Sequence, residues 1–254
     1  MEEIVFYKYE GTGNDFIMLD NRMKKFPVDE NLIKHLCDRR FGIGADGLIL
    51  LEQQDGYDFR MVYFNSDGRE STFCGNGGRC AAAFARQLGL VQDTTYFMAK
   101  DGEHQASFEG NQVRLKMSDA GFPAPSGEGF TLFTGSPHYV EFNADVMQAD
   151  VFGQGRKIRQ SFGEDGINVN FVEEKTDGIL IRTYERGVED ETLSCGTGVT
   201  AAALLASTRG YESPVLVESK GGQLRVEFSR SENGFTGVFL TGPVRQVFSG
   251  TIRI

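Results

Sequence analysis

Short stretches in which apolar and polar residues alternate occur along most of the chain, with turn residues between them. Alternation with a period of two is typical of β-strands that bury one face. Stretches of this kind, or apolar runs of strand length, occur at residues 4–9, 16–19, 48–51, 59–64, 95–99, 104–109 and 112–117. The turns Asp101-Gly102 and Gly110-Asn111 separate the last three stretches, which predicts antiparallel neighbours.

Three other stretches predict helices. Asp29 is a suitable N-cap for a helix that runs to about Arg39 and has apolar residues on one face. The alanine-rich stretches 80–88 and 199–207 have few polar residues on any face. A helix that is apolar all round is buried, so we expect these two to pack against their own sheets.

One sequence pattern occurs twice. Cys-Gly-Asn-Gly-Gly-Arg at 74–79 and Cys-Gly-Thr-Gly-Val-Thr at 195–200 lie 121 residues apart, and each runs into three alanines. Three further landmarks recur in the same order at offsets of 119 to 122 residues; they begin at Thr12 and Thr134, at Asp46 and Asp165, and at Ala99 and Ser219. The constant offset indicates a duplicated unit of roughly half the chain.

The predicted fold is therefore α/β of the α+β type, with two pseudo-symmetric domains. Strands outnumber helices in each half and short turns join many of them, so we expect each domain to be a mostly antiparallel curved sheet around a central helix. Residues 119–130 are rich in Gly, Pro and Ser and are predicted to be the linker. A pseudo-two-fold axis would place the active site in the cleft between the domains.

Composition and charge exclude several classes of protein. The net charge of −10 and the lack of a long basic run argue against a nucleic acid or an anionic membrane as partner. No apolar run approaches the ~20 residues of a membrane span, and the start Met-Glu-Glu-Ile lacks the features of a secretory signal. We therefore expect a cytoplasmic protein. Its four cysteines form no CxxC pair and no zinc-ligand spacing, so no metal site is predicted.

The two cysteine motifs have the chemistry of a reactive pair. The first N–H groups of a helix have no intrahelical partner, and the helix dipole favours a thiolate there. The neighbouring glycines let a ligand carboxylate approach these N–H groups. A single copy could be a structural turn with a buried cysteine, but two copies at matching points favour two thiols on opposite sides of one substrate. That arrangement fits a 1,1-proton transfer without pyridoxal phosphate.

Seven motifs identify a family. In order along the chain they are Gly11-Thr-Gly-Asn-Asp-Phe16, Phe64-Asn-Ser-Asp-Gly68, Cys74-Gly-Asn-Gly77, Pro137-His138, Ile167-Asn-Val169, Glu185-Arg-Gly187 and Cys195-Gly-Thr-Gly198. The set closely resembles diaminopimelate epimerase, nearly from end to end. The resemblance implies interconversion of LL- and meso-diaminopimelate, a small-molecule substrate, in lysine and peptidoglycan-precursor biosynthesis, with no cofactor and no metal.

The resemblance also implies a homodimer and a C-terminal strand that returns to the first domain. The N-terminal half would then comprise residues 1–118 and about 246–254, and the C-terminal half residues 119–245. Carried over by position, Cys74 and Cys195 match the family's acid/base pair. Four residues match the groups that hold the reacting carboxylate, namely Gly75, Asn76, Gly196 and Thr197.

The resemblance assigns a second group of residues to the far end of the substrate, which is itself an amino acid. These are Asn14, Asn65, Asn168, Glu185 and Arg186. An arginine for a carboxylate and a glutamate for an ammonium make a clamp for a zwitterion. His138 and Glu185 match family residues expected to tune the pKa of the thiols.

Three positions depart from the family pattern. Ser136 stands where the family usually has Asn before Pro-His, so a hydroxyl or water would replace one amide contact. Gly47 stands where some members have a Gln, so only its backbone could contribute. The loop 188–192 before Cys195 is one residue longer than the common form.

Three alternatives remain beside this interpretation. A relative of proline racemase would not need Glu185 and Arg186 for a second amino acid centre. An isomerase of the phenazine-biosynthesis type would lack the paired cysteines. The third alternative is a redox-responsive binding protein in which Cys74 and Cys195 form a switchable disulfide, and such a protein would have no turnover.

Overall fold

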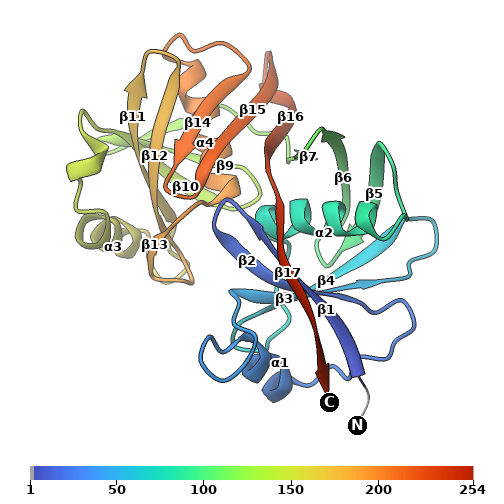
Figure 1. The fold of residues 1–254 in the computed structure, drawn as a ribbon. Coiled ribbons are helices and arrows are strands. Elements are labelled where there is room, and N and C mark those ends of the chain that lie inside the picture. Colours follow the sequence, from blue (N-terminus) through green and yellow to red (C-terminus); the bar gives the residue numbers. More distant parts are fainter. Residues whose placement is uncertain (1–2, 254) are drawn as a thin grey trace. The chain divides into compact units, whose positions relative to one another are not determined.

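The computed structural model describes residues 3–253. The chain divides into two compact units, of which the first comprises Met1–Leu115 with Pro243–Ile254 and the second Lys116–Gly242. Figure 1 shows the elements of both units.

The first unit consists of strands with two helices between them. Its elements are β1 (Glu3–Gly11), β2 (Asn14–Asp20), α1 (Glu30–Cys37), β3 (Gly47–Glu52), β4 (Phe59–Asn65), α2 (Gly75–Gln87), β5 (Thr94–Ala99), β6 (Gly102–Glu109), β7 (Gln112–Lys116) and β17 (Arg245–Arg253).

The second unit has the same general composition. Its elements are β8 (Ala124–Ser126), β9 (Gly129–Phe133), β10 (Pro137–Phe142), the 3-10 helix η1 (Val146–Gln148), α3 (Val151–Ser161), β11 (Asn168–Lys175), β12 (Gly178–Glu185), β13 (Asp190–Thr192), α4 (Gly196–Ser207), β14 (Val215–Ser219), β15 (Gly222–Ser231) and β16 (Gly234–Pro243).

The strands of the two units pair in the same sequence of directions, which confirms the predicted duplication. In the first unit β1–β2 is antiparallel, β2–β3 parallel, β3–β4 antiparallel, β4–β5 parallel, and β5–β6 and β6–β7 antiparallel. In the second unit β9–β10, β10–β11, β11–β12, β12–β14, β14–β15 and β15–β16 repeat those directions one by one. The predicted majority of antiparallel pairs is also confirmed.

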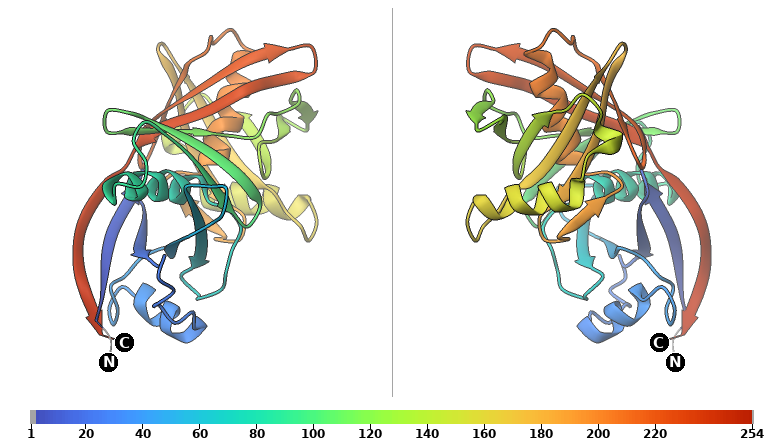
Figure 2. Two further views of the ribbon diagram at one scale, coloured as in Figure 1. Left: turned by 90° about the vertical axis from the view of Figure 1, so that its right-hand side faces the viewer. Right: turned by 90° about the vertical axis from the view of Figure 1, so that its left-hand side faces the viewer.

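Three strands lie outside this shared order. In the second unit β8 pairs with β9, and β13 pairs antiparallel with β12. In the first unit β17 pairs antiparallel with β1, from Glu3 opposite Arg253 to Glu10 opposite Arg245. Figures 1 and 2 show the red β17 alongside the blue β1. The C-terminal strand therefore returns to the first unit, as the family resemblance implies.

The two alanine-rich helices are buried, as predicted. In α2, Ala81, Ala82 and Ala85 are fully buried, and the helix packs against β1, β2, β3 and β4. In α4, ten of the twelve residues are buried against β10, β11, β12, β14 and β15. The small side chains of the alanines let each helix approach its sheet closely.

Helix α1 begins at its predicted N-cap. The side chain of Asp29 accepts a hydrogen bond from the N–H of Leu32 at 2.8 Å. The helix ends at Cys37, two residues before the expected end at Arg39, because Asp38 has an extended backbone with ψ 126°.

Two parts of the chain differ from expectation. The predicted linker, residues 119–130, contains β8 and the first residues of β9, because Ala124 pairs with Thr131 although the segment lacks alternation. Helix α3 has no counterpart among the predicted elements. Only two of its residues are buried, Val151 and Gly155, so it lacks the apolar periodicity that reveals a helix in a sequence.

Within residues 3–253, no helix combines the length and the apolar composition that crossing a membrane would require.

Candidate active site

Each unit has a cysteine at the start of its buried helix. Cys74 is the N-cap of α2 with φ −120° and ψ 121°, and Cys195 is the N-cap of α4 with φ −111° and ψ 112°. The carbonyl of each cysteine accepts the first hydrogen bond of its helix, and neither sulfur caps its helix. Both thiols thus lie at the positive end of a helix dipole, which favours their thiolate forms.

A matched ion pair precedes each cysteine. Lys100 Nζ lies 3.8 Å from Glu70 Oε1 in the first unit, and Lys220 Nζ lies 2.8 Å from Glu191 Oε1 in the second. Both glutamates lie four residues before their cysteine, so the duplication extends to the charges around each motif. In the second unit Arg182 also donates to both carboxylate oxygens of Glu191, at 2.7 and 2.8 Å.

In the first unit the structure brings together three predicted site residues, Cys74, Asn14 and Asn76. We call the cysteine of each unit and the residues around it a half-site. Asn14 Oδ1 lies 3.6 Å from the sulfur of Cys74 and accepts a hydrogen bond from Asn76 Nδ2 at 3.4 Å. Asn14 Nδ2 donates to a carboxylate oxygen of Asp46 at 2.8 Å. Because a carboxylate accepts hydrogen bonds, this contact fixes which end of the Asn14 amide faces the cysteine.

An ion cluster beside Asn14 stabilises this arrangement. Arg39 donates to both oxygens of Asp15, at 2.9 and 2.7 Å, and Lys8 Nζ lies 2.7 Å from the same carboxylate. Burial by itself would raise the pKa of Asp15, but the hydrogen bonds from Arg39 and Lys8 outweigh it and lower that pKa from 3.8 to about 2. The cluster therefore stays charged at neutral pH and anchors the start of β2.

Arg79 is a polar residue of this half-site that the sequence did not single out. It is fully buried in α2, and Nη2 donates to Asn76 Oδ1 at 3.0 Å and to Thr12 Oγ1 at 3.1 Å. Burial lowers the pKa of Arg79, while its attraction to Cys80, Cys74 and Glu10 acts in the opposite direction. Arg79 thus orients the Asn76 amide so that Nδ2 faces Asn14.

Asn65 and Glu185 occupy equivalent positions in the two units. Asn65 is the last residue of β4 and Glu185 is the last residue of β12. Asn65 lies opposite Gly47 across β3 and β4. A Cβ at Gly47 would come within 2.5 Å of the Phe64 carbonyl and 2.6 Å of the Tyr63 ring. This packing explains why no side chain is present at position 47.

In the second unit a hydroxyl and a histidine lie beside the cysteine. Thr197 Oγ1 is 3.5 Å from the sulfur of Cys195 and 2.9 Å from Nε2 of His138. Ser136 Oγ is 2.9 Å from the same nitrogen and 3.1 Å from Thr197 Oγ1. Ser136, which replaces the usual family Asn, is therefore part of the hydrogen-bonded group around Cys195.

His138 is uncharged at neutral pH. It is fully buried, and this burial, together with the positive charge of Arg186, lowers the pKa of His138 from 6.5 to about 3. A neutral imidazole donates from one ring nitrogen and accepts at the other. His138 therefore acts on its neighbours through hydrogen bonds and carries no positive charge.

The buried neutral state of His138 predicts a loss of stability in weak acid. Below pH 6.5 the unfolded chain binds a proton at this residue that the folded chain does not, so the free energy of unfolding falls as the pH falls. We expect His138 to account for a loss of roughly 2 kcal/mol between pH 7 and pH 5. Urea unfolding of the native protein and of His138→Gln at both pH values measures this loss.

The control for this experiment is His35→Gln, since His35 is exposed on α1. That variant is expected to keep the full pH dependence of the native protein. If His138→Gln lost as much stability between pH 7 and pH 5 as the native protein, His138 would not be neutral in the folded state.

Asn168 and Arg186 are connected in the second unit. Asn168 Nδ2 donates to Ser136 Oγ and to the Pro137 carbonyl, both at 3.1 Å, while its Oδ1 accepts from the backbone N–H of Arg186 at 2.9 Å. Both amide hydrogens of Asn168 thus have acceptors within the unit, and a ligand would compete with them. The guanidinium of Arg186 donates from Nη1 to the Asp165 carbonyl at 3.0 Å.

Sequence reasoning also missed Asn170 and Thr183. Asn170 is fully buried, and its Nδ2 lies 3.1 Å from Nδ1 of His138. Thr183 Oγ1 donates to Asn170 Oδ1 at 3.0 Å. Asn170 follows Asn168 by two residues in β11, so the two side chains share one face of that strand. This shared face was the available signal.

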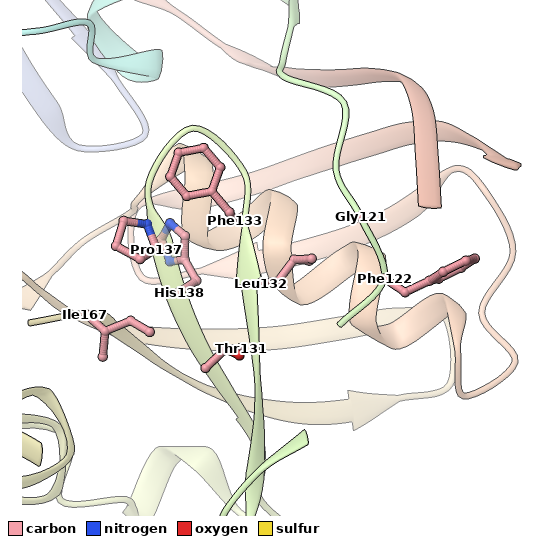
Figure 3. A pocket seen from close by; sticks show the side chains of 8 residues that line it. All are labelled: Gly121, Phe122, Thr131, Leu132, Phe133, Pro137, His138 and Ile167. Carbon is pink, nitrogen blue, oxygen red and sulfur yellow. The ribbon is translucent and has the colours of Figure 1, made fainter. Parts of the chain in front are cut away.

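A pocket of about 330 Å³ lies beside this half-site (Figure 3). His138 and Pro137 line one side of it, Phe122 lines the other, and Leu132 lies between them. His138 is the one titratable residue of its lining and is neutral at neutral pH, so the pocket offers no charge to the ends of an amino acid. We therefore place the candidate site at the two cysteine motifs and not in this pocket.

The other two cysteines belong to the interior. Cys37, the last residue of α1, packs in the core, and burial raises its pKa to about 12. Burial likewise raises the pKa of Cys80, in α2. All four cysteines lie among the described residues, and no disulfide joins them.

The fold is shared with crystal structures of low sequence identity. The phenazine biosynthesis protein of the PhzF family from Bacillus anthracis has a TM-score of 0.76 and 15% identity, with all of both chains covered. A hydroxyproline epimerase from Agrobacterium vitis has a TM-score of 0.68 and 14% identity, with 98% of this chain and 92% of that chain covered. These structures define the class, a pseudo-symmetric two-domain α/β fold.

Sequence comparison identifies the family within this class. The diaminopimelate epimerase family model matches residues 6–122 and 130–247. Diaminopimelate epimerase from Flavobacterium psychrophilum is 49% identical over 253 residues, 97% of this chain and 99% of that protein. The enzyme of this name from Chlorobaculum tepidum is 43% identical, with 96% and 99% covered. The chain belongs to the diaminopimelate epimerase family.

Proposed function

We propose that this chain is an isomerase that interconverts LL-2,6-diaminopimelate and meso-diaminopimelate by a two-base proton transfer. Cys74 and Cys195 are the proposed catalytic pair. The observation that carries the proposal is the duplicated half-site, in which each unit has a cysteine at the N-terminus of a buried helix with nearly the same backbone angles. Membership of the family, whose model matches both units, supports it.

The chemistry requires the two sulfurs to reach opposite faces of one Cα. One cysteine, as the thiolate, removes the Cα proton and becomes a thiol, and the electron pair of the C–H bond passes toward the carboxylate. The other cysteine, as the thiol, supplies a proton to the opposite face and becomes a thiolate. In the reverse reaction the two exchange roles, so neither proton nor charge accumulates over a full cycle.

The negative charge that develops on the substrate needs hydrogen-bond donors in fixed positions. Backbone N–H groups at the start of α2 and α4 are suited to this role, because the helix interior does not use them. The residues at these two points are Gly75, Asn76, Gly196 and Thr197. Glycine at the first helical position of each motif allows a carboxylate to approach the backbone.

The far amino acid centre of the substrate is proposed to bind to a second set of residues. Arg186 would pair with its carboxylate and Glu185 with its ammonium, with contributions from Asn14, Asn65 and Asn168. Both Arg186 and Glu185 are half-buried at the end of β12. Partial burial strengthens an ion pair relative to one in bulk water.

The remaining parts of the proposal concern the surroundings of the reaction. We propose that the enzyme uses no cofactor, works in the cytoplasm, and supplies lysine and peptidoglycan-precursor biosynthesis. A homodimer is also proposed; the exposed apolar side chains of Val5, Val247 and Phe248 on β1 and β17 offer a surface for it. A mass equal to that of one chain, measured by light scattering on the eluting protein, would contradict the dimer.

Incubation with LL-diaminopimelate in D2O tests the proposed function. We expect meso-diaminopimelate to form and deuterium to appear at Cα, because the proton delivered to the new face comes from a thiol that exchanges with solvent. Added reductant should restore any activity lost to oxidation. Neither product nor deuterium uptake under reducing conditions would contradict the function and would favour a binding protein.

A further inference from the structure

A buried polar group lies behind Cys195, and two of its positions are occupied by apolar residues in the first unit. His138, Asn170 and Thr183 form it, and each is buried. The paired strands show which residues are equivalent in the first unit. In the second unit His138 lies opposite Asn168, and Asn170 lies opposite Thr183. In the first unit Phe16 lies opposite Gly47, and Ile49 lies opposite Tyr63. Phe16 is therefore equivalent to His138, and Ile49 to Asn170.

The two glycines that end the cysteine motifs support this equivalence. A Cβ at Gly77 would meet the Ile49 and Phe16 side chains, at 3.0 and 3.5 Å. A Cβ at Gly198 would meet Asn170 Oδ1 at 2.4 Å and His138 Cε1 at 3.4 Å. These equivalent positions are therefore occupied by apolar side chains in the first unit and by a histidine and an asparagine in the second. Since the apolar version builds the same sheet, the polar version is not required for folding.

The orientation of the Asn170 amide follows from its neighbours. One end lies 2.9 Å from the backbone carbonyl of Tyr139, which can only accept a hydrogen bond, so this end is the nitrogen. The other end, Oδ1, accepts from Thr183 Oγ1 at 3.0 Å. The nitrogen also faces Nδ1 of His138 at 3.1 Å. Nδ1 must therefore accept, and the single proton of the neutral ring is on Nε2.

The position of this proton decides how the hydroxyl groups around Cys195 are ordered. Four contacts link Nε2, Ser136 Oγ, Thr197 Oγ1 and the sulfur of Cys195, with lengths of 2.9, 2.9, 3.1 and 3.5 Å. With the proton on Nε2, a shared N–H serves the two contacts of the ring, Ser136 donates to Thr197, and Thr197 donates to the sulfur. With the proton on Nδ1, only the two hydroxyl protons would remain for all four contacts when Cys195 is a thiolate, and only three protons when it is a thiol.

We propose that Asn170 is a positioning residue for the reaction, because it holds His138 in the Nε2–H form and so directs the hydroxyl proton of Thr197 to the sulfur of Cys195. Thr183 fixes the amide of Asn170 in the orientation this requires. The hydrogen bond from Thr197 stabilises the thiolate of Cys195 each time that cysteine gives up its proton. The role of this group in turnover rests on the proposed function, whereas the tautomer of His138 does not.

The tautomer is measurable by nitrogen NMR on the native protein without substrate. The chain has three histidines, so protein labelled with 15N-histidine gives a simple spectrum, and His138→Gln identifies the signals of His138. At neutral pH we expect a protonated Nε2 and an unprotonated Nδ1 at His138. A protonated Nδ1 would overturn the proposal, whatever the variants below show.

Asn170→Asp reverses the hydrogen bond with little change of size. The atom that faces Nδ1 of His138 then accepts, so the proton is expected on Nδ1, or on both nitrogens if the ring becomes charged. We expect kcat to fall about 10-fold to 100-fold, as for partners that orient a reactive group, with KM changed less than about threefold because the Asn170 side chain is fully buried. Asn233→Asp, the same change in the exposed turn after β15, is the control and should alter neither the tautomer nor kcat.

Thr183→Val provides a second variant in case Asn170→Asp fails to fold. It removes the hydroxyl that holds Oδ1 of Asn170 and is expected to lower the Nε2–H population and kcat together. A changed tautomer with unchanged kcat in either variant would overturn the role in the reaction. Native protein with the expected Nε2–H signal and no epimerase activity would contradict the proposed function alone, whereas activity with a protonated Nδ1 would contradict this inference alone.

Discussion

Replacement of Cys74 or Cys195 by alanine is expected to abolish the interconversion of LL- and meso-diaminopimelate, with a loss of at least about 10³-fold in rate. Each variant retains one thiol and therefore one of the two proton transfers. Inversion requires removal of a proton from one face and delivery to the other, so one thiol cannot complete it. The conversion of LL substrate to meso product, followed by chromatography of the stereoisomers, measures the loss.

Deuterium uptake adds a sharper expectation to the same experiment. A variant with a single thiolate can still remove the proton on its own side and return a deuteron from D2O to that side. Each variant should thus label one stereoisomer without inverting it, and the two variants should label opposite stereoisomers. This pattern would also identify which cysteine acts as the base toward LL-diaminopimelate.

Cys37→Ala is the matched control for both cysteine variants. Cys37 is the last residue of α1 and packs in the hydrophobic core, outside both cysteine motifs. This variant loses some stability because a buried side chain is shortened, but it should keep normal turnover at a temperature where it stays folded. Normal turnover in Cys74→Ala or in Cys195→Ala would contradict the two-thiol mechanism.

The sequence was sufficient to predict the duplication and the placement of Cys74 and Cys195 at the starts of two helices, because both depend on local patterns. A constant offset between repeated motifs needs no knowledge of tertiary contacts, and the pairing directions of the strands agree with it. The buried helices were predictable for the same reason, since 80–88 and 199–207 lack a polar face. Helix α3 was missed because Gly153 and Gly155 replace the apolar residues that mark a helix.

The contact between His138 and Asn170 could not be predicted, because it joins residues far apart in the chain. His138 and Asn170 are 32 residues apart and meet only through the pairing of β10 with β11. In the sequence, Asn168 and Asn170 alternate with apolar residues, which is the pattern of a strand with one face in water. Helix α4 covers that face instead, so both amides are buried.

Arg79 was missed for a related reason. An arginine in a glycine-rich motif suggests an exposed side chain, since arginine is rarely buried. Its guanidinium is instead enclosed between α2 and the β1–β2 turn, where Thr12 and Asn76 accept from it. A buried charge is retained where removal would leave its partners unsatisfied, and one of these partners is itself a candidate for substrate binding.

Arg186→Met is expected to lower kcat/KM for LL-diaminopimelate by roughly 100-fold or more. The substitution keeps a side chain of similar length but removes the guanidinium proposed to bind the far carboxylate, and the loss of a partly desolvated charge-assisted hydrogen bond costs about 2–5 kcal/mol. Arg186→Lys retains the charge without the two parallel donors and should lose less. Steady-state rates at varied substrate concentration measure both variants.

The matched control is Arg209→Met, which removes an arginine of the same unit that pairs with Glu174 at the surface. It should leave kcat/KM unchanged, and an equal loss in both variants would mean that net charge alone matters. Only one half of the duplication carries the charged pair: β12 ends at Glu185 before Arg186, whereas β4 ends at Asn65 before Ser66. If the equivalent cysteines perform the proton transfers, this difference must select the substrate. Unchanged KM and kcat in Arg186→Met would contradict that division of roles while leaving the two thiols in place.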